Sequence, residues 1–167
     1  MGKVVSQDEL ICLRENWRRD CTRMAFTYGI FDLLHPGHVR LLEQAADLGD
    51  ILVVGIESDA RVRERFASRK DSGKSATRPI IPGPERSEIL AALAAVDYVV
   101  EFDEPMLQEL IKRLAPDVLV LGDEPGLDES SLPGDIMQSA GVKTVRIPLE
   151  PGYSTSRLVD RIKQLHT

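Results

Sequence analysis

The feature that most constrains this chain is the segment ILVVGI at residues 51–56, in which five of six residues are strongly apolar. A strand tolerates such a run when both of its faces are covered, as happens in a parallel sheet flanked by helices. Helix-length segments stand before and after it, at residues 37–48 and 58–66, and the first carries apolar residues at helical spacing. The pattern therefore predicts β-α-β units that place helices on both faces of a parallel sheet.

The same alternation of short apolar segments and helix-length segments runs along the rest of the chain. Strands are predicted at residues 23–28, 51–56, 98–101, 118–121 and 143–147. Helices are predicted at residues 37–48, 58–66, 85–95, 105–114 and 154–165. Because 167 residues suit one domain, we predict a single α/β domain with a doubly wound, parallel, five-stranded sheet.

An extra helix is predicted ahead of the first strand. Ser6 followed by Glu9 is a capping-box pattern, and apolar residues recur at helical spacing after it. We expect this helix, which ends near residue 19, to pack outside the sheet. Residues 1–22 are therefore predicted to form an amino-terminal helix and lead-in, and residues 23–167 the main domain.

The charge balance excludes several classes of partner. Acidic residues outnumber basic ones by 27 to 21, which gives a net charge of -6 and a pI near 5.1. Such a chain has no general affinity for nucleic acid or for an anionic membrane. No apolar run approaches the roughly 20 residues that span a bilayer, and the amino end lacks a secretory-signal pattern. We therefore expect a cytoplasmic protein in which Cys12 and Cys21 are reduced thiols.

Two of the three histidines stand in one tetrapeptide, His35-Pro36-Gly37-His38, between the first strand and its helix. This places two imidazoles at the start of a helix, where free backbone N–H groups and the helix dipole favour an anion. Gly37 has no side chain, which lets a phosphate group approach the backbone closely. The tetrapeptide therefore predicts a phosphate-binding site in which His35 and His38 face the same group.

Two other interpretations of the histidine pair are open at this point. The pair could bind zinc, although no third ligand stands at a recognisable spacing and the remaining His166 lies at the carboxyl end. The histidines could also be exposed turn residues without a role. The topology favours binding, because the ligand crevice of a doubly wound sheet lies outside the carboxyl ends of its strands. We expect residues 29–37, 122–129 and 149–156 to meet there.

Two segments resemble the motifs of a known family. Residues 27–38, TYGIFDLLHPGH, look like the signature of the cytidylyltransferase-like nucleotidyltransferases, and residues 153–156, YSTS, look like their second motif at the start of the last helix. The resemblance covers nearly the whole chain and implies a Rossmann-like fold. It also implies a reaction in which a phosphorylated small molecule attacks the α-phosphate of ATP or CTP and releases pyrophosphate, with no covalent protein intermediate.

The resemblance also implies roles for individual residues. His35 and His38 would be catalytic and would stabilise the charge that develops on the α- and β-phosphates. The implied nucleotide-binding residues are Ile30, Phe31, Gly37, Arg86, Gly122, Asp123, Ser154, Thr155 and Ser156. The turn at residues 154–156 would take the β- and γ-phosphates at a helix N-terminus. Arg86 would reach the phosphates, or would alternatively form a surface ion pair at the start of its helix.

The second substrate is expected to bind basic residues that follow the second strand. The candidates for its phosphate are Arg65, Arg69, Lys70, Lys74 and Arg78. The alternative for this segment is a solvated, charged lid. Asp32 is a supporting residue that could orient His35 or end the strand as a turn residue.

A Mg²⁺ ion is expected to bridge the triphosphate through phosphate oxygens and water, so no metal site built by the protein is predicted. The implied partners are therefore small molecules, namely the nucleoside triphosphate and a sugar or polyol phosphate. Relatives in the family are often dimers, and a homodimer is left open.

Two branches of the family compete for the particular activity. Residues 121–124, LGDE, and the first motif look like glycerol-3-phosphate cytidylyltransferase. The amino-terminal helix, residues 85–90 and residues 151–155 look like the heptose-1-phosphate adenylyltransferases that make ADP-heptose, and they cover more of the chain. We therefore favour the sugar-phosphate adenylyltransferase over the CTP-dependent enzyme. A non-catalytic nucleotide-binding regulatory domain is the alternative from another class, and the intact motifs argue against it.

Overall fold

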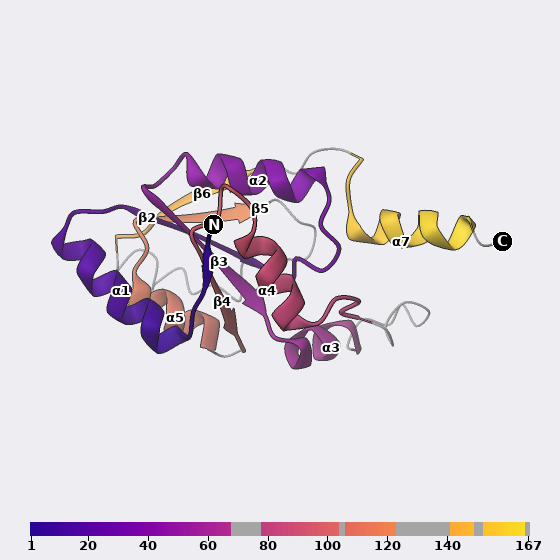
Figure 1. The fold of residues 1–167 in the computed structure, drawn as a ribbon, viewed down its shortest axis with the longest axis horizontal. Coiled ribbons are helices and arrows are strands. Elements are labelled where there is room, and N and C mark those ends of the chain that lie inside the picture. The colour runs from indigo at the N-terminus through magenta and orange to yellow at the C-terminus, as the bar shows by residue number, and fades with distance from the viewer. Residues whose placement is uncertain (68–77, 104–105, 123–140, 149–151, 166–167) are drawn as a thin grey trace.

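The computed structural model describes residues 1–67, 78–103, 106–122, 141–148 and 152–165. Within these residues the centre is an all-parallel sheet in the order β1-β4-β3-β2-β5-β6 (Figure 1). The strands are β1 (Lys3–Val4), β2 (Met24–Gly29), β3 (Ile51–Glu57), β4 (Tyr98–Phe102), β5 (Val118–Gly122) and β6 (Lys143–Ile147). The prediction of one α/β domain built on a doubly wound parallel sheet is confirmed.

The sheet has six strands, so the prediction of five was wrong by one. The extra strand, β1, has only two residues, both exposed, and Lys3 pairs with Tyr98 of β4. An edge strand this short buries almost nothing, so neither an apolar run nor an alternating pattern marks it in the sequence. Gly2 allows the close approach, because a Cβ atom there would lie 2.5 Å from the carbonyl oxygen of Val96.

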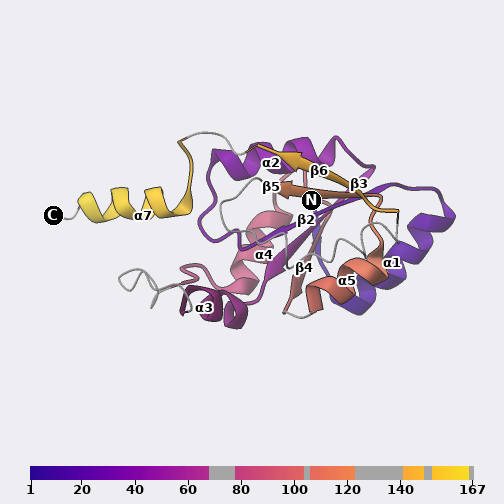
Figure 2. The same cartoon turned by 180° about the vertical axis from the view of Figure 1, so that it is seen from behind.

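Helices cover both faces of the sheet. They are α1 (Gln7–Arg19), α2 (Pro36–Ala46), α3 (Asp59–Ala67), α4 (Gly83–Ala91), α5 (Met106–Leu114) and α7 (Thr155–Gln164). α1 and α5 pack on one face, and α2 and α4 pack on the other, as the two opposite views show (Figure 1, Figure 2). α7 stands apart from the sheet in both views, and none of its residues is buried.

Successive side chains of each strand point to opposite faces of the sheet, which divides the core into two layers. Phe26 and Tyr28 of β2 belong to the layer under α1 and α5, whereas Ala25 belongs to the layer under α2 and α4. The predicted amino-terminal helix is confirmed, because the Ser6 side chain accepts a hydrogen bond from the Glu9 N–H at 3.2 Å. Each face of the sheet is thus sealed by its own pair of helices.

One buried cation joins α1 to the end of α5. The Arg14 side chain is buried, and its guanidinium donates to the carbonyl oxygens of Leu114 and Ala115 at 2.9 Å and 2.8 Å. It also pairs with the Asp117 carboxylate at 3.0 Å. These carbonyls belong to the end of α5, where helix geometry leaves them without intrahelical partners. Arg14 therefore joins the two helices that cover this face.

Replacing Arg14 with Ala should lower the free energy of unfolding by about 2 kcal/mol, because three hydrogen-bonded contacts of a buried cation are lost. The Leu114 carbonyl keeps a bond from Arg18, and the Asp117 carboxylate keeps one from the Met24 N–H, whereas the Ala115 carbonyl loses its partner. Urea unfolding followed by circular dichroism measures this change. Arg19→Ala removes an exposed cation from the same helix and serves as the control, with a change of about 0.5 kcal/mol or less. Equal effects of the two substitutions would contradict the assignment.

Candidate active site

The candidate ligand-binding crevice lies at the point in the sheet where the strands begin to be added on the other side. From β2 the chain continues outward on one side through β3 and β4, and on the other side through β5 and β6. The carboxyl ends of β2 and β5 are therefore the switch point at which doubly wound sheets bind ligands. Gly122, a predicted nucleotide-binding residue, ends β5 at this point. The predicted Asp123 lies outside the described residues.

His35 and His38 stack on one another at the start of α2. His35 is the N-cap residue in an extended backbone conformation, and its Nδ1 atom accepts a hydrogen bond from the His38 backbone N–H at 3.3 Å. The ring centroids lie 3.7 Å apart with an interplanar angle of 15°. The two rings therefore lie together at the start of α2, and that both of them face one bound group stays a prediction.

Burial keeps both imidazoles neutral. It lowers the pKa of His35, and it lowers the pKa of His38 to about 4, to which the neighbouring His35 also contributes. Because the Nδ1 atom of His35 accepts a hydrogen bond, its proton stands on Nε2. In the described part of the chain the Nδ1 atom of His38 is buried without a partner. The pair therefore offers N–H donors rather than permanent cations, and a bound anion would raise both pKa values.

Because Gly37 has no side chain, it leaves room for the stacked His35 ring. A Cβ atom at this position would lie 3.1 Å from Nδ1 of His35 and 3.3 Å from Cβ of Tyr153. That this glycine admits a phosphate group stays a prediction, and in the structure it leaves room for Tyr153, the first residue of the second motif. This close approach brings the two motifs together.

The second motif forms the opposite wall of the site. Ser154 is the N-cap of α7, and its Oγ accepts a hydrogen bond from the Arg157 N–H at 3.2 Å. The Thr155 hydroxyl donates to the carbonyl oxygen of Leu33, in the loop that leads to the histidines, at 3.3 Å. Ser156 lies exposed in the first turn of α7. Two segments that are far apart in the sequence thus share one crevice.

A pocket of about 390 Å³ lies between these walls. It is lined by His35, Gly152, Tyr153, Ser154, Arg157, Leu158 and Arg161. The ring centroids of His35 and Tyr153 are 6.2 Å apart, so the tyrosine closes one side. Imidazole N–H groups, hydroxyls and guanidinium groups are donors that phosphate oxygens accept from.

Arg157 and Arg161 are site residues that the sequence analysis missed. They follow Ser154 by three and seven positions, a spacing that places both on the face of α7 that the N-cap side chain occupies. That spacing is the signal that could have found them. It was overlooked because basic residues on a terminal helix are ordinarily a solvated surface.

The backbone after β2 makes a tight turn into the site. Phe31 has a φ of 47°, in the left-handed region that non-glycine residues rarely adopt, and its ring lies 5.4 Å from that of His38. Arg86 stabilises this turn, because its guanidinium donates a hydrogen bond to the Ile30 carbonyl oxygen at 2.6 Å. Ile30 and Phe31, the predicted α-phosphate residues, are therefore positioned at the mouth of the crevice.

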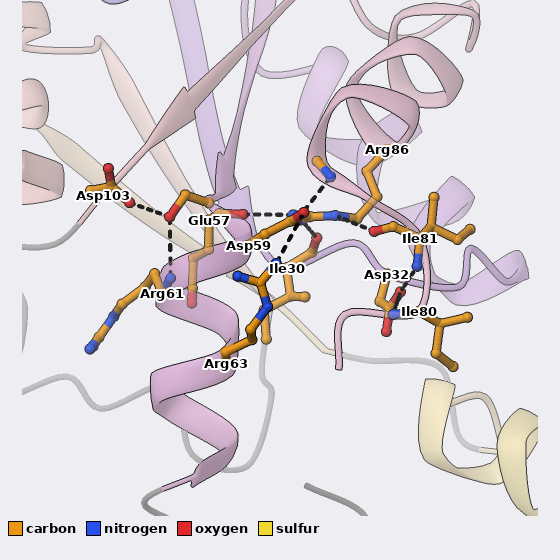
Figure 3. A network of polar contacts seen from close by, with 12 residues as sticks. Ile30, Asp32, Glu57, Asp59, Arg61, Arg63, Ile80, Ile81, Arg86 and Asp103 are labelled. Carbon is orange, nitrogen blue, oxygen red and sulfur yellow. Dashed lines mark hydrogen bonds and ion pairs between the residues drawn. The ribbon is translucent and has the colours of Figure 1, made fainter. Parts of the chain in front are cut away.

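Arg86 is the best-satisfied side chain near the site and is only 1% exposed. Besides Ile30, it donates to the carbonyl oxygens of Glu57 and Ile81, both at 3.0 Å, and pairs with Asp59 at 2.6 Å (Figure 3). The ion pair considered in the sequence analysis therefore exists, and it lies in the interior rather than at the surface. These contacts give Arg86 a positioning role, and a direct contact with phosphate stays a prediction.

Asp32 organises a neighbouring segment rather than a histidine. Its carboxylate pairs with Arg78 at 2.7 Å and accepts hydrogen bonds from the N–H groups of Ile80 and Ile81, both at 2.9 Å (Figure 3). Among the hydrogen bonds of the described residues, none joins Asp32 to His35. Asp32 therefore supports residues 78–81 and not the His35 ring.

The predicted acceptor residues divide into two groups. Arg78 and Arg65 are described, and each pairs with a buried carboxylate, namely Asp32 and Glu57. Arg69, Lys70 and Lys74 lie outside the described residues. In the ranges that the structure covers, no three His, Cys, Asp or Glu side chains come together as metal ligands. No helix there is long and apolar enough to cross a membrane.

The paired imidazoles at the start of α2 and the hydroxyl-bearing start of α7 meet at a pocket lined by hydrogen-bond donors. A family profile described as cytidylyltransferase-like matches residues 26–161. The chain belongs to this cytidylyltransferase-like family.

Curated relatives agree with this assignment over almost the full chain. The bifunctional protein HldE of Koribacter versatilis (strain Ellin345) is 44% identical over 160 residues, which are 96% of this chain and 31% of that protein. HldE of Syntrophotalea carbinolica is 41% identical over 161 residues, again 96% of this chain and 31% of the relative. The chain therefore spans about a third of the length of the curated relatives it matches.

Solved structures give the same fold. The lipopolysaccharide core biosynthesis protein from Thermoplasma volcanium GSS1 superposes with a TM-score of 0.60 at 26% identity, covering 77% of this chain and 97% of that one. Pantoate-beta-alanine ligase from Francisella tularensis, solved with beta-gamma ATP and beta-alanine, superposes with a TM-score of 0.64 at 13% identity, covering 100% of this chain and 79% of that one. At that identity the second likeness concerns the fold alone.

The buried histidines make stability depend on pH. Because the pKa of His38 is about 4 in the folded chain and 6.5 in the unfolded one, the unfolded state binds the extra proton as pH falls between these values. The stability contributed by neutral His38 is full above pH 6.5 and is lost towards pH 4, by about 3 kcal/mol in total.

Urea unfolding of the wild type and of His38→Gln across this pH range measures the effect. The glutamine cannot take up a proton, so the variant should lose less stability on acidification, with His35 supplying the remaining slope in the same direction. Parallel pH profiles for the two proteins would show that His38 titrates normally in the folded chain.

Proposed function

We propose that this chain transfers the adenylyl group of ATP to a heptose 1-phosphate, releasing pyrophosphate and forming ADP-heptose. The observation that carries the proposal is the neutral His35–His38 stack, of which His35 lines the pocket together with Ser154, Arg157 and Arg161. The similarity to bifunctional HldE proteins over 96% of the chain supports the choice of reaction.

The pocket suits the β- and γ-phosphates of the nucleotide. The free N–H groups at the start of α7 and the hydroxyls of the second motif would donate to phosphate oxygens, and the two arginines of α7 would balance their charge. The leaving pyrophosphate would therefore be held on the α7 side of the crevice. The α-phosphate would lie at the turn formed by Ile30 and Phe31.

The reaction is a direct substitution at the α-phosphorus. An oxygen of the acceptor phosphate forms a bond to the α-phosphorus, and the bond to the oxygen that bridges the α- and β-phosphates breaks. The electron pair of that bond leaves with pyrophosphate, on which negative charge accumulates. His35 Nε2–H donates towards this charge, and the stacked His38 holds the ring in place, so the site is preorganised for the transition state.

The donors that line the pocket are nitrogens and hydroxyls, which suit phosphate oxygens better than Mg²⁺, an ion that prefers oxygen ligands. We therefore propose that Mg²⁺ would be carried by the triphosphate and held indirectly, by the residues that hold the phosphates. When bound, the ion neutralises part of the phosphate charge and lowers the cost of nucleophilic attack.

Pyrophosphate release measured with ATP and with CTP, each combined with heptose 1-phosphate or glycerol 3-phosphate, tests the proposal. We expect turnover with ATP and heptose 1-phosphate. Turnover confined to CTP and glycerol 3-phosphate would replace the proposal with the cytidylyltransferase alternative. Nucleotide binding by calorimetry without release from any pair would identify a regulatory domain.

Replacing His38 with Ala should lower kcat about 100-fold or more, because the ring that holds the His35 donor next to the developing charge is lost. Steady-state kinetics measure this, and circular dichroism checks that the variant is folded. Lys112→Ala removes an exposed cation from α5, on the other face of the sheet, and should leave kcat unchanged. Wild-type turnover in the histidine variant would assign the pair a structural role only.

A further inference from the structure

Within the described residues, one buried carboxylate near the site has a hydrogen-bond partner for only one of its two oxygens. Glu57 is the last residue of β3 and is 5% exposed. Its Oε1 atom pairs with Arg65 of α3, whereas its Oε2 atom is buried without a hydrogen bond within the described residues. A buried acceptor that lacks a donor costs free energy, so each such group in a native protein calls for an explanation. A ligand hydroxyl would supply the missing donor.

Tyr28 lies next to this carboxylate on the same face of the sheet. In the register of β2 and β3, Tyr28 stands opposite Gly55, and Glu57 follows Gly55 by two residues, which returns it to the same face. Burial, together with the charge of Glu57, raises the pKa of Tyr28 to about 12, so its hydroxyl remains a donor. A carboxylate that only accepts thus neighbours a phenol that can donate.

These two groups lie on the opposite side of the sheet from the histidines. Tyr28 belongs to the core layer of α1 and α5, whereas the histidines enter the crevice from α2, which covers the other face. The Arg86 guanidinium bonds to the carbonyl oxygens of both Ile30 and Glu57, so the α-phosphate turn and the end of β3 are held by one side chain. In Figure 3, Glu57 lies on one side of the Arg86–Asp59 contact and Asp32 on the other.

The geometry of the substitution agrees with this separation. In phosphoryl-type transfer the attacking and leaving oxygens lie roughly in line through the phosphorus. If pyrophosphate leaves on the side of His35 and α7, the acceptor approaches the α-phosphate from the opposite side. Tyr28 and Glu57 stand on that face, near the ends of β2 and β3.

We propose that Glu57 and Tyr28 form a subsite that binds hydroxyl groups of the acceptor sugar on the face opposite the histidines. The proposal rests on the proposed function and specifies its acceptor as a polyhydroxylated phosphate. The free Oε2 atom accepts from one hydroxyl, and the Tyr28 hydroxyl bonds to a neighbouring one. Arg65 balances the charge of Glu57, so the carboxylate does not repel the acceptor phosphate. A site built to bond a hydroxyl discriminates strongly against an analogue that lacks it.

Glu57→Gln tests the subsite, because the amide keeps the size of the side chain and can still accept from Arg65 while presenting N–H donors where Oε2 accepted. The KM for heptose 1-phosphate should rise about 10-fold or more, since a hydrogen bond to a charged group is lost. The kcat and the dissociation constant for ATP, measured by calorimetry without acceptor, should stay at their wild-type values. A series of monodeoxy heptose 1-phosphates should include one whose KM is raised in the wild type and raised no further in the variant.

Glu101→Gln is the matched control. Glu101 is an exposed carboxylate on β4 that pairs in register with Ile56, so it faces the other side of the sheet at nearly the same level. Its substitution makes the same change of charge and should leave the acceptor KM unchanged. Tyr28→Phe, which deletes one hydroxyl, should also raise the acceptor KM, and it decides the matter if Glu57→Gln fails to fold.

The two proposals fail in different ways. A wild type that turns over, with the acceptor KM unchanged in both Glu57→Gln and Tyr28→Phe, would overturn the subsite and leave the adenylyl transfer standing. An equal rise of the acceptor KM in Glu101→Gln would also overturn it, because the effect would then reflect charge alone. A wild type that neither binds ATP nor releases pyrophosphate would instead overturn the proposed function.

Discussion

The site depends on one buried guanidinium. Arg86 joins the carbonyl oxygens at the ends of β2 and β3 to Asp59 and Ile81, and it thereby fixes the distance between the turn at Ile30 and the end of β3. Strand ends expose carbonyl groups that lack partners once the ladder stops, and a forked cation can bond to several of them at once. Without it, the turn at Ile30, which we propose to hold the α-phosphate, would lose the side chain that ties it to the end of β3.

The histidine stack shows how burial sets the chemistry of this site. Two cationic rings 3.7 Å apart would repel one another, and desolvation further lowers the pKa of each, so both are neutral in the free protein. Their N–H donors are nevertheless preorganised by the N-cap bond between His35 and His38. A triphosphate entering the pocket would therefore meet oriented dipoles, together with the arginines of α7 as the fixed charges.

Much of the site could be predicted because its motifs are local. The spacing of His35 and His38 at a helix start, and the hydroxyls before the last helix, follow from capping and helix geometry that a short segment contains. The partners of Arg86, Asp32 and Arg65 could not be predicted in this way. Each bonds to atoms that come from other elements of the chain, and the charge of a residue does not indicate which carboxylate or carbonyl will neutralise it.

The sequence alone determined the alternation of strands and helices, the parallel sheet, the capped amino-terminal helix and the two family motifs, because hydrophobic period and capping chemistry act over a few residues. The tertiary structure decided the rest. It added the edge strand β1, which depends on pairing with β4, and it brought Thr155 to the loop of Leu33. It also left one oxygen of Glu57 buried and unpaired, a property that depends on every neighbour of the side chain and that no local pattern encodes.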